Sequence, residues 1–132
     1  MCIRDRLHVL EGHDNSINDM TFSPDGQTLI STSYDDTVKM WRVSDGALLA
    51  TLEPGYESAA GAVAVSPDGG LVVTGELFGN TLHLWRATDG ALLATLQGGY
   101  SGGMGALAFS PDGTMLAAGA EDGTVTFWGI PE

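Results

Sequence analysis

The sequence predicts an all-β protein built from three repeated units of four short strands. Ser-Pro-Asp-Gly occurs three times, beginning at Ser23, Ser66 and Ser110, so that successive copies are 43 and 44 residues apart. A tryptophan follows each copy at a nearly constant distance. The stretch Asp-Gly-Ala-Leu-Leu-Ala-Thr-Leu is repeated without change at 45–52 and 89–96. The 19 glycines in 132 residues are about double the usual share, which favours many tight turns over long helices.

Each period divides into four strands separated by turns. Val38 and Met40 are expected on one face of the third strand, and Lys39 and Trp41 on the other, because successive side chains of a strand point to opposite faces. Proline and glycine in the Ser-Pro-Asp-Gly stretch supply the backbone angles of a tight turn. The strands predicted for the first period are 18–23, 27–33, 37–43 and 47–52.

A period of 40 to 45 residues is typical of one blade of a β-propeller, and it has no helical pattern. The chain is therefore predicted to form three four-stranded antiparallel blades of an incomplete propeller. The last repeat stops four residues after Trp128, so its outer strand is missing. Leu7 to Leu10 is typical of a fourth strand without a blade of its own. Residues 1–6 fit no part of the repeat and are interpreted as a non-native leader, and 7–132 divides into repeats of about 7–46, 47–90 and 91–132.

Several marks recur in register and resemble the WD repeat over about residues 7–131. In the first period these marks are Gly12-His13, then Phe22-Ser23-Pro24-Asp25-Gly26, then Asp35 to Trp41. The resemblance implies a structural chain of hydrogen bonds within the blade, formed by His13, Ser31, Asp35 and Trp41. Such a chain is physically reasonable because a buried indole N–H needs an acceptor and a buried carboxylate needs donors.

The second and third periods depart from this pattern. Tyr56 stands in the place of His13 and Gly79 in the place of Asp35, while the third period has Tyr100 and Ala118 in the places of His13 and Ser31. We therefore expect these two blades to be held more by packing than by the network. The aspartate expected after each tryptophan is also absent, and the residues found there are Arg42, Arg86 and Gly129.

The charge of the chain argues against nucleic acid and acidic membranes as partners. Five lysines and arginines against 17 aspartates and glutamates give a formal net charge of −12, which repels phosphate groups. The excess acid is either a steering field for basic partners or a consequence of turn chemistry, and the second interpretation is favoured. Five aspartates precede a glycine in predicted turns, namely Asp25, Asp45, Asp68, Asp89 and Asp112.

No signal peptide or membrane-spanning stretch is visible, so a cytoplasmic location is expected.

The sequence predicts neither an enzyme nor a cofactor or metal site. No nucleophile elbow, zinc-binding helix motif or phosphate-binding glycine loop is present. Cys2 and the three histidines form no metal-ligand spacing. His83 alternates with leucines on a strand and is expected at a solvent edge or a blade interface.

A non-catalytic scaffold that presents propeller loops to protein or peptide partners is the favoured function. The residues expected on that loop surface are Tyr34, Tyr56, Leu77, Phe78 and Tyr100, of which Tyr56 and Tyr100 are also explained by packing between blades. One alternative is a regulatory or targeting propeller appended to an upstream catalytic or signalling domain. Another is a structural homo-oligomer in which two chains give six blades, although missing upstream blades are the favoured explanation of the incomplete ring.

Overall fold

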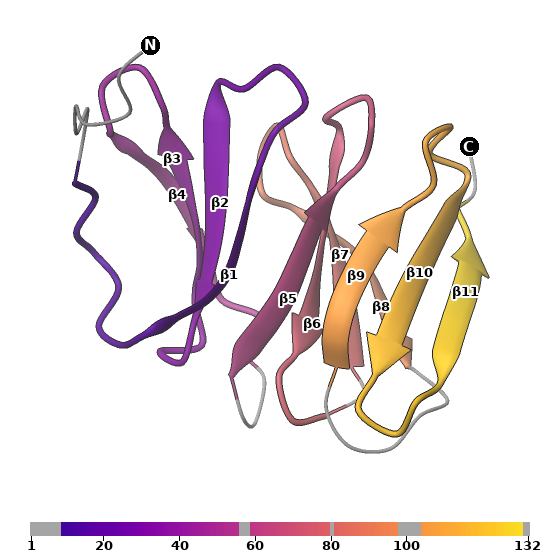
Figure 1. Cartoon of the computed structure of the whole chain (residues 1–132). Coiled ribbons are helices and arrows are strands. Elements are labelled where there is room, and N and C mark those ends of the chain that lie inside the picture. Colours follow the sequence, from indigo (N-terminus) through magenta and orange to yellow (C-terminus); the bar gives the residue numbers. More distant parts are fainter. Residues whose placement is uncertain (1–8, 56–58, 80, 98–103, 131–132) are drawn as a thin grey trace, which may run out of the picture.

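The structure is a computed structural model that describes residues 9–55, 59–79, 81–97 and 104–130, which form three antiparallel sheets (Figure 1). The first sheet contains β1 (Ile17–Phe22), β2 (Thr28–Ser33), β3 (Val38–Arg42) and β4 (Leu48–Leu52). The second contains β5 (Ala60–Val65), β6 (Leu71–Glu76), β7 (Thr81–Arg86) and β8 (Leu92–Gln97). The third contains β9 (Met104–Phe109), β10 (Met115–Ala120) and β11 (Val125–Gly129).

The predicted fold class is confirmed. Each sheet runs in chain order as a meander, and the third lacks an outer strand within the described residues. The four strands predicted for the first period agree with β1 to β4 to within one residue at each end. Val9 and Leu10 lie in no strand, whereas Leu7, His8 and the predicted leader 1–6 lie outside the described residues.

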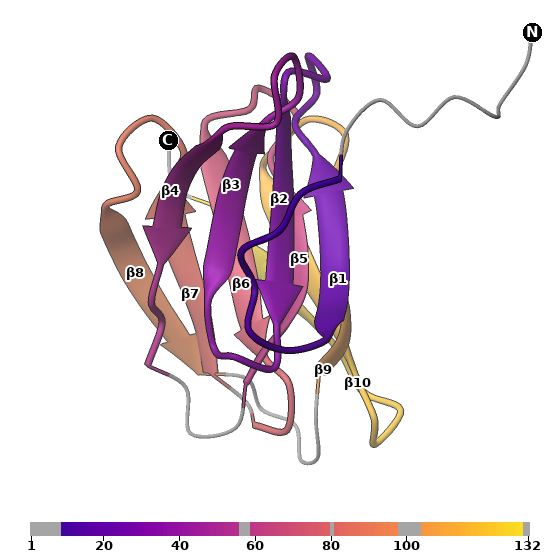
Figure 2. The same cartoon turned by 90° about the vertical axis from the view of Figure 1, so that its left-hand side faces the viewer.

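The three sheets stand side by side, with β5 next to both β1 and β9 (Figure 1). The two ends of this row carry different turns. The turn face carries the Ser-Pro-Asp-Gly turns, at the upper end in Figure 1. The loop face, at the lower end, carries the β2–β3, β6–β7 and β10–β11 turns, the segment that precedes β1 and, as Figure 2 also shows, the segment that follows β4. On the loop face, Tyr34 N–H donates to Ser16 O at 3.0 Å and Leu77 N–H donates to Ala59 O at 2.8 Å.

The core consists of two apolar clusters, each between two neighbouring sheets. The first joins the first and second sheets and contains Ile30, Val38, Met40, Leu52, Ala60, Val63, Val72 and Trp85. The second joins the second and third sheets and contains Ala62, Ala64, Val73, Leu82, Leu84, Leu116 and Ala118. Each sheet is thus stabilised by the sheet next to it, since a single sheet cannot bury its own faces.

Most of the turn aspartates act within their own turns. Asp25 Oδ1 accepts hydrogen bonds from the Ser23 hydroxyl at 2.6 Å and from Gln27 N–H at 3.0 Å. The next residue, Gly26, has a φ of 72°, which disfavours any other residue type. The Ser110 hydroxyl and both donors of Thr114 lower the pKa of Asp112 to about 2. The interpretation that much of the excess acid belongs to turns therefore agrees with these contacts.

Gly61 in β5 lies against the backbone at the end of β6, where the β6–β7 turn begins. A Cβ atom added to Gly61 would lie 2.9 Å from Leu77 Cα and 3.2 Å from Gly75 O. Both neighbours are backbone atoms, so a small rotation of a side chain cannot relieve the contact. The equivalent residue of the third sheet is Gly105, where the nearest atom, Gly119 O, would lie at 3.7 Å.

We expect Gly61→Ala to lower the free energy of unfolding by about 1–3 kcal/mol, because the added methyl group overpacks a rigid backbone site. Gly105→Ala is the matched control and should change it by less than about 0.5 kcal/mol, since its methyl group makes only ordinary contacts. Denaturant unfolding monitored by tryptophan fluorescence measures both. Equal effects of the two substitutions would contradict the assignment of the close contact.

Candidate functional site

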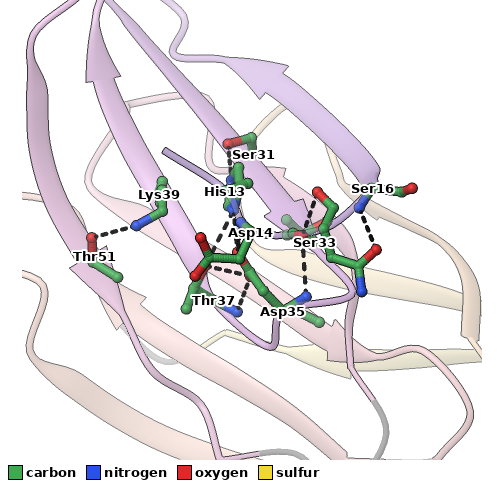
Figure 3. A network of polar contacts seen from close by, with 12 residues as sticks. His13, Asp14, Ser16, Ser31, Ser33, Asp35, Thr37, Lys39 and Thr51 are labelled. Carbon is green, nitrogen blue, oxygen red and sulfur yellow. Dashed lines mark hydrogen bonds and ion pairs between the residues drawn. The ribbon is translucent and has the colours of Figure 1, made fainter. Parts of the chain in front are cut away.

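The four residues that the WD-repeat resemblance singled out are joined by hydrogen bonds within the first blade. Figure 3 shows three of them, His13, Ser31 and Asp35. Trp41 Nε1–H donates to the Ser31 hydroxyl at 2.9 Å, and this hydroxyl lies 2.7 Å from His13 Nε2. His13 Nδ1 lies 3.1 Å from Asp35 Oδ2. Because the Ser31 oxygen accepts from the indole, its own proton is available to Nε2, which leaves Nδ1 protonated and donating to the carboxylate.

Asp35 is the residue on which most donors of this network converge. Its carboxylate also accepts from Asp14 N–H at 2.9 Å, from Thr37 N–H at 2.9 Å and from the Thr37 hydroxyl at 2.6 Å. Burial raises the pKa of Asp35, but the hydrogen bonds from Thr37, Asp14 and His13 outweigh it and hold the pKa well below its usual range. The ionised carboxylate therefore ties the segment before β1 to the β2–β3 turn.

This network is built for stability rather than for chemistry. Only 5% of the His13 side chain and 10% of the Asp35 side chain are exposed. Both imidazole nitrogens are within hydrogen-bond distance of partners in the same blade. A general base needs a nitrogen that can reach a substrate proton, and this imidazole offers none.

Part of the network persists in the second sheet, which the sequence analysis did not anticipate. Trp85 Nε1–H donates to the Thr74 hydroxyl at 3.0 Å, so Thr74 takes the place of Ser31. The signal was present in the sequence, because Thr74 precedes Trp85 by 11 residues and Ser31 precedes Trp41 by 10. The expectation that this blade is held more by packing than by the network did not include this hydrogen bond, which the indole of Trp85 keeps.

His83 is buried at the interface between blades and does not lie at a solvent edge. Its ring stacks on Trp85 with centroids 5.6 Å apart and an interplanar angle of 26°. Only 8% of the residue is exposed. Burial lowers the pKa of His83, and the carboxylate of Glu76 partly opposes this shift. A neutral imidazole stacked on an indole is a packing element of this blade.

In the third sheet, Asp122 keeps its turn role and accepts from Thr124 N–H at 2.9 Å. Ala118 has no hydroxyl to offer the indole of Trp128. Trp128 instead packs, half-buried, against the second apolar cluster. This contact is consistent with the expectation that the third blade is held more by packing than by the network.

The residues predicted to bind partners are placed unevenly. Tyr34 is 44% exposed and Phe78 is 61% exposed, both on the loop face. Leu77 is half-buried beside them. Tyr56 and Tyr100 lie outside the described residues.

In the described ranges, no three His, Cys, Asp or Glu side chains are grouped as a metal site requires, and no helix could cross a membrane.

We expect Ser31→Ala to lower the free energy of unfolding by about 1–3 kcal/mol, because it leaves the Trp41 N–H and His13 Nε2 buried without a partner. Ser31→Thr is the control. It keeps the hydroxyl, as Thr74 does in the second sheet, and should retain most of the stability. Thermal and denaturant unfolding measure the difference, and a threonine variant as unstable as the alanine variant would count against the hydrogen bond.

The lowered pKa of Asp35 predicts that the free energy of unfolding depends on pH. Its pKa is lowered from an ordinary value of 3.8, so its stabilising effect is complete above that value, begins to decrease as the pH falls through it, and is lost only when the pH falls through the lowered pKa of the folded state. Asp35→Asn should therefore cost about 1–3 kcal/mol near pH 7, and the cost should be smaller by about 1 kcal/mol near pH 3. Denaturant titrations at both pH values measure the two costs. A cost that is equal at both would refute an ionised Asp35 as the source.

Comparison with known proteins agrees with this geometry. The family model described as "WD domain, G-beta repeat" matches residues 4–42, 46–86 and 90–129. The solved structure of the RRP9 WD40 repeats superposes with a TM-score of 0.87 at 27% identity, covering 93% of this chain and 38% of that one.

Curated relatives match over shorter stretches. An uncharacterized WD repeat-containing protein of Synechocystis sp. is 34% identical over 73 residues, which are 54% of this chain and 21% of the relative. The small ribosomal subunit protein RACK1y of Oryza sativa is 40% identical over 67 residues, 49% of this chain and 20% of the relative. The matched part of the chain is thus about a fifth of the length of each of these two relatives. With its three matched repeats and its propeller-like sheets, the chain belongs to the WD40 repeat family.

Proposed function

We propose that this chain is a non-catalytic interaction scaffold whose loop face binds a protein or peptide partner. The observation that carries the proposal is the pair of exposed aromatic side chains Tyr34 and Phe78, on equivalent turns of neighbouring sheets. Aromatic side chains are enriched at the centres of protein interfaces, because they bury a large area at little cost in entropy.

The rigidity of the two turns supports this proposal. Tyr34 N–H bonds to Ser16 O, and Leu77 N–H, next to Phe78, bonds to Ala59 O. Each turn is therefore tied to the segment that enters its own sheet. Aromatic groups held in this way lose little conformational freedom on binding, which favours affinity.

The charge of the same surface indicates the chemistry of the partner. Asp14, Glu53 and Glu121 are exposed carboxylates in the segments and turns that form the loop face. With a net charge of −12 for the whole chain, this surface attracts positively charged segments and accelerates their encounter. A peptide that carries lysine or arginine beside an apolar anchor fits both features.

The test is a selection of peptides from a display library against the full chain, followed by calorimetry. We expect the selected peptides to be basic, and the double variant Tyr34→Ala with Phe78→Ala to weaken their binding by about tenfold or more. Leu49→Ala is the matched control, because Leu49 is an exposed apolar residue on β4, away from the loop face. It should leave the affinity unchanged.

Two outcomes would contradict the proposal. Peptides that bind the double variant as tightly as the unmodified chain would place the binding surface elsewhere. Single-stranded RNA that binds as tightly as the best peptides would identify a different class of partner. Tighter binding at lower salt is the expected signature of the carboxylates.

A further inference from the structure

A cavity of about 290 Å³ opens on the turn face between the first and second sheets, at the upper end in Figure 1. Its floor is apolar, because it is formed by Ile30 of β2 and Met40 of β3, which are 1% and 6% exposed. Val65 and Ala87 of the second repeat line the opposite wall. The cavity lies between two neighbouring sheets and not on an outer face of the row, so a further sheet added at either end would not cover it.

The equivalent space between the second and third sheets is filled by two larger side chains. Phe109 stands one period after Val65, and Ile130 stands one period after Ala87. Phe109 and Ile130 are half-buried and pack against the second apolar cluster. The first interface thus has a valine and an alanine where the second has a phenylalanine and an isoleucine. The cavity is the space that this difference in side-chain volume leaves.

The turn face of the second interface is hollowed in a different way. A hollow of about 460 Å³ opens there, and Ile130 lines it together with residues of the two turns. It does not reach Val73 or Leu84, which are the counterparts of Ile30 and Met40. The apolar floor is therefore accessible from the turn face at the first interface and covered at the second.

Hydrogen bonds across the first interface hold the two walls of the cavity in place. Asn18 Nδ2–H donates to Ala60 O at 2.7 Å, and Asp19 Oδ2 accepts from Val63 N–H at 3.1 Å. The Thr32 hydroxyl donates to a further backbone carbonyl of β5. The counterparts of these three side chains at the second interface have no donor or acceptor, and they are Gly61, Ala62 and Gly75.

The two turns that border the cavity are also in contact. A Cβ atom placed on Gly69 would lie 3.6 Å from Pro24 Cδ, so one turn rests against the other. This contact and the hydrogen bonds at the other end of the strands fix the walls at both ends. A preformed cavity needs little rearrangement on binding, and the flexible thioether of Met40 can adapt to the shape of an inserted group.

Two carboxylates stand at the mouth of the cavity. Asp25 and Asp68, from consecutive Ser-Pro-Asp-Gly turns, line the cavity and are exposed. Hydrogen bonds within their own turns, chiefly from the Ser23 and Ser66 hydroxyls, lower the pKa of both, so both are ionised at neutral pH. Among the described residues that line the cavity, none is a lysine or arginine. The mouth therefore attracts positive charge.

We propose that this cavity receives a phenylalanine or isoleucine side chain of a partner peptide, whose flanking lysine or arginine side chains pair with Asp25 and Asp68. The choice of side chain follows from the second interface, where Phe109 and Ile130 fill the equivalent space. At about 290 Å³, the cavity is just below the range typical of small-molecule sites, which favours a single inserted side chain. This site is at the opposite end of the sheets from the loop face and does not depend on it.

The first experiment is an NMR titration of the full ¹⁵N-labelled chain with three peptides, Gly-Lys-Phe-Lys-Gly, Gly-Lys-Ala-Lys-Gly and Gly-Glu-Phe-Glu-Gly. We expect the first peptide to shift the amide signals of the turns at 23–26 and 66–69. It should bind about tenfold or more tightly than the alanine peptide, because only a phenylalanine fills the apolar floor. It should also bind about tenfold or more tightly than the glutamate peptide, which Asp25 and Asp68 repel.

The double variant Val65→Phe with Ala87→Ile tests the location. It gives the first interface the residue types of the second and fills the cavity, so the lysine–phenylalanine peptide should no longer shift the turn signals. This variant should unfold at the same or a higher temperature, because filling a cavity stabilises a protein when the added groups fit. Leu93→Phe is the matched control. It adds a phenylalanine on β8 at a residue that is 43% exposed and outside the cavity, and it should leave the affinity unchanged.

A second double variant, Asp25→Asn with Asp68→Asn, tests the mouth and leaves the apolar floor unaltered. Asparagine can keep the hydrogen bonds of the turns but not the charge. The lysine–phenylalanine peptide should bind this variant about threefold or more weakly, and its affinity should depend less on salt. This readout also applies where the filled variant does not fold.

Four results would overturn the proposal. One is a lysine–phenylalanine peptide that shifts no turn signal at about 1 mM. Another is a folded Val65→Phe, Ala87→Ile variant that binds this peptide as tightly as the unmodified chain does. The third is equal affinity for the glutamate peptide. The fourth is binding that Tyr34→Ala with Phe78→Ala abolishes, which would place the peptide on the loop face.

Discussion

The contact between the faces of consecutive sheets is the interaction on which the structure depends. Each sheet is only three or four short strands wide, and it becomes stable by burying its faces against its neighbours. The middle sheet does so on both sides, with Val63 and Val72 in one cluster and Leu82 and Leu84 in the other. The turns and the polar network then fix the position of each sheet, and the loop face can vary without disturbing this core.

The repeat made the fold predictable from the sequence. Recurring tryptophans and turns gave the strands to within a residue, and the alternation from Val38 to Trp41 gave the correct faces of β3. The network of His13, Ser31, Asp35 and Trp41 could be named in advance because its members occur at fixed positions of the repeat. Local patterns of this kind are visible in a sequence because each residue acts within one blade.

What the sequence did not reveal depends on contacts between blades. Thr74 was overlooked because the second period was compared with the first only at the positions of the histidine and the aspartate, although the indole needs a hydroxyl whether or not these two residues are present. The burial of His83 depends on the neighbouring sheet, and alternation along one strand cannot report it. The bonds of Asn18 and Asp19 to β5 join residues more than 40 positions apart, so no local pattern indicates them.

These bonds have a consequence for the order in which the molecule comes apart. In an array of repeats, stability is approximately a sum over units and their shared boundaries, so the weakest boundary opens first. The boundary between the first and second sheets combines apolar contact with directional bonds from Asn18, Asp19 and Thr32, whereas the other has glycine and alanine at those positions. Under heat or mechanical load we therefore expect the third sheet to detach while the first two persist as a cooperative pair, a folding intermediate whose amide protons exchange last.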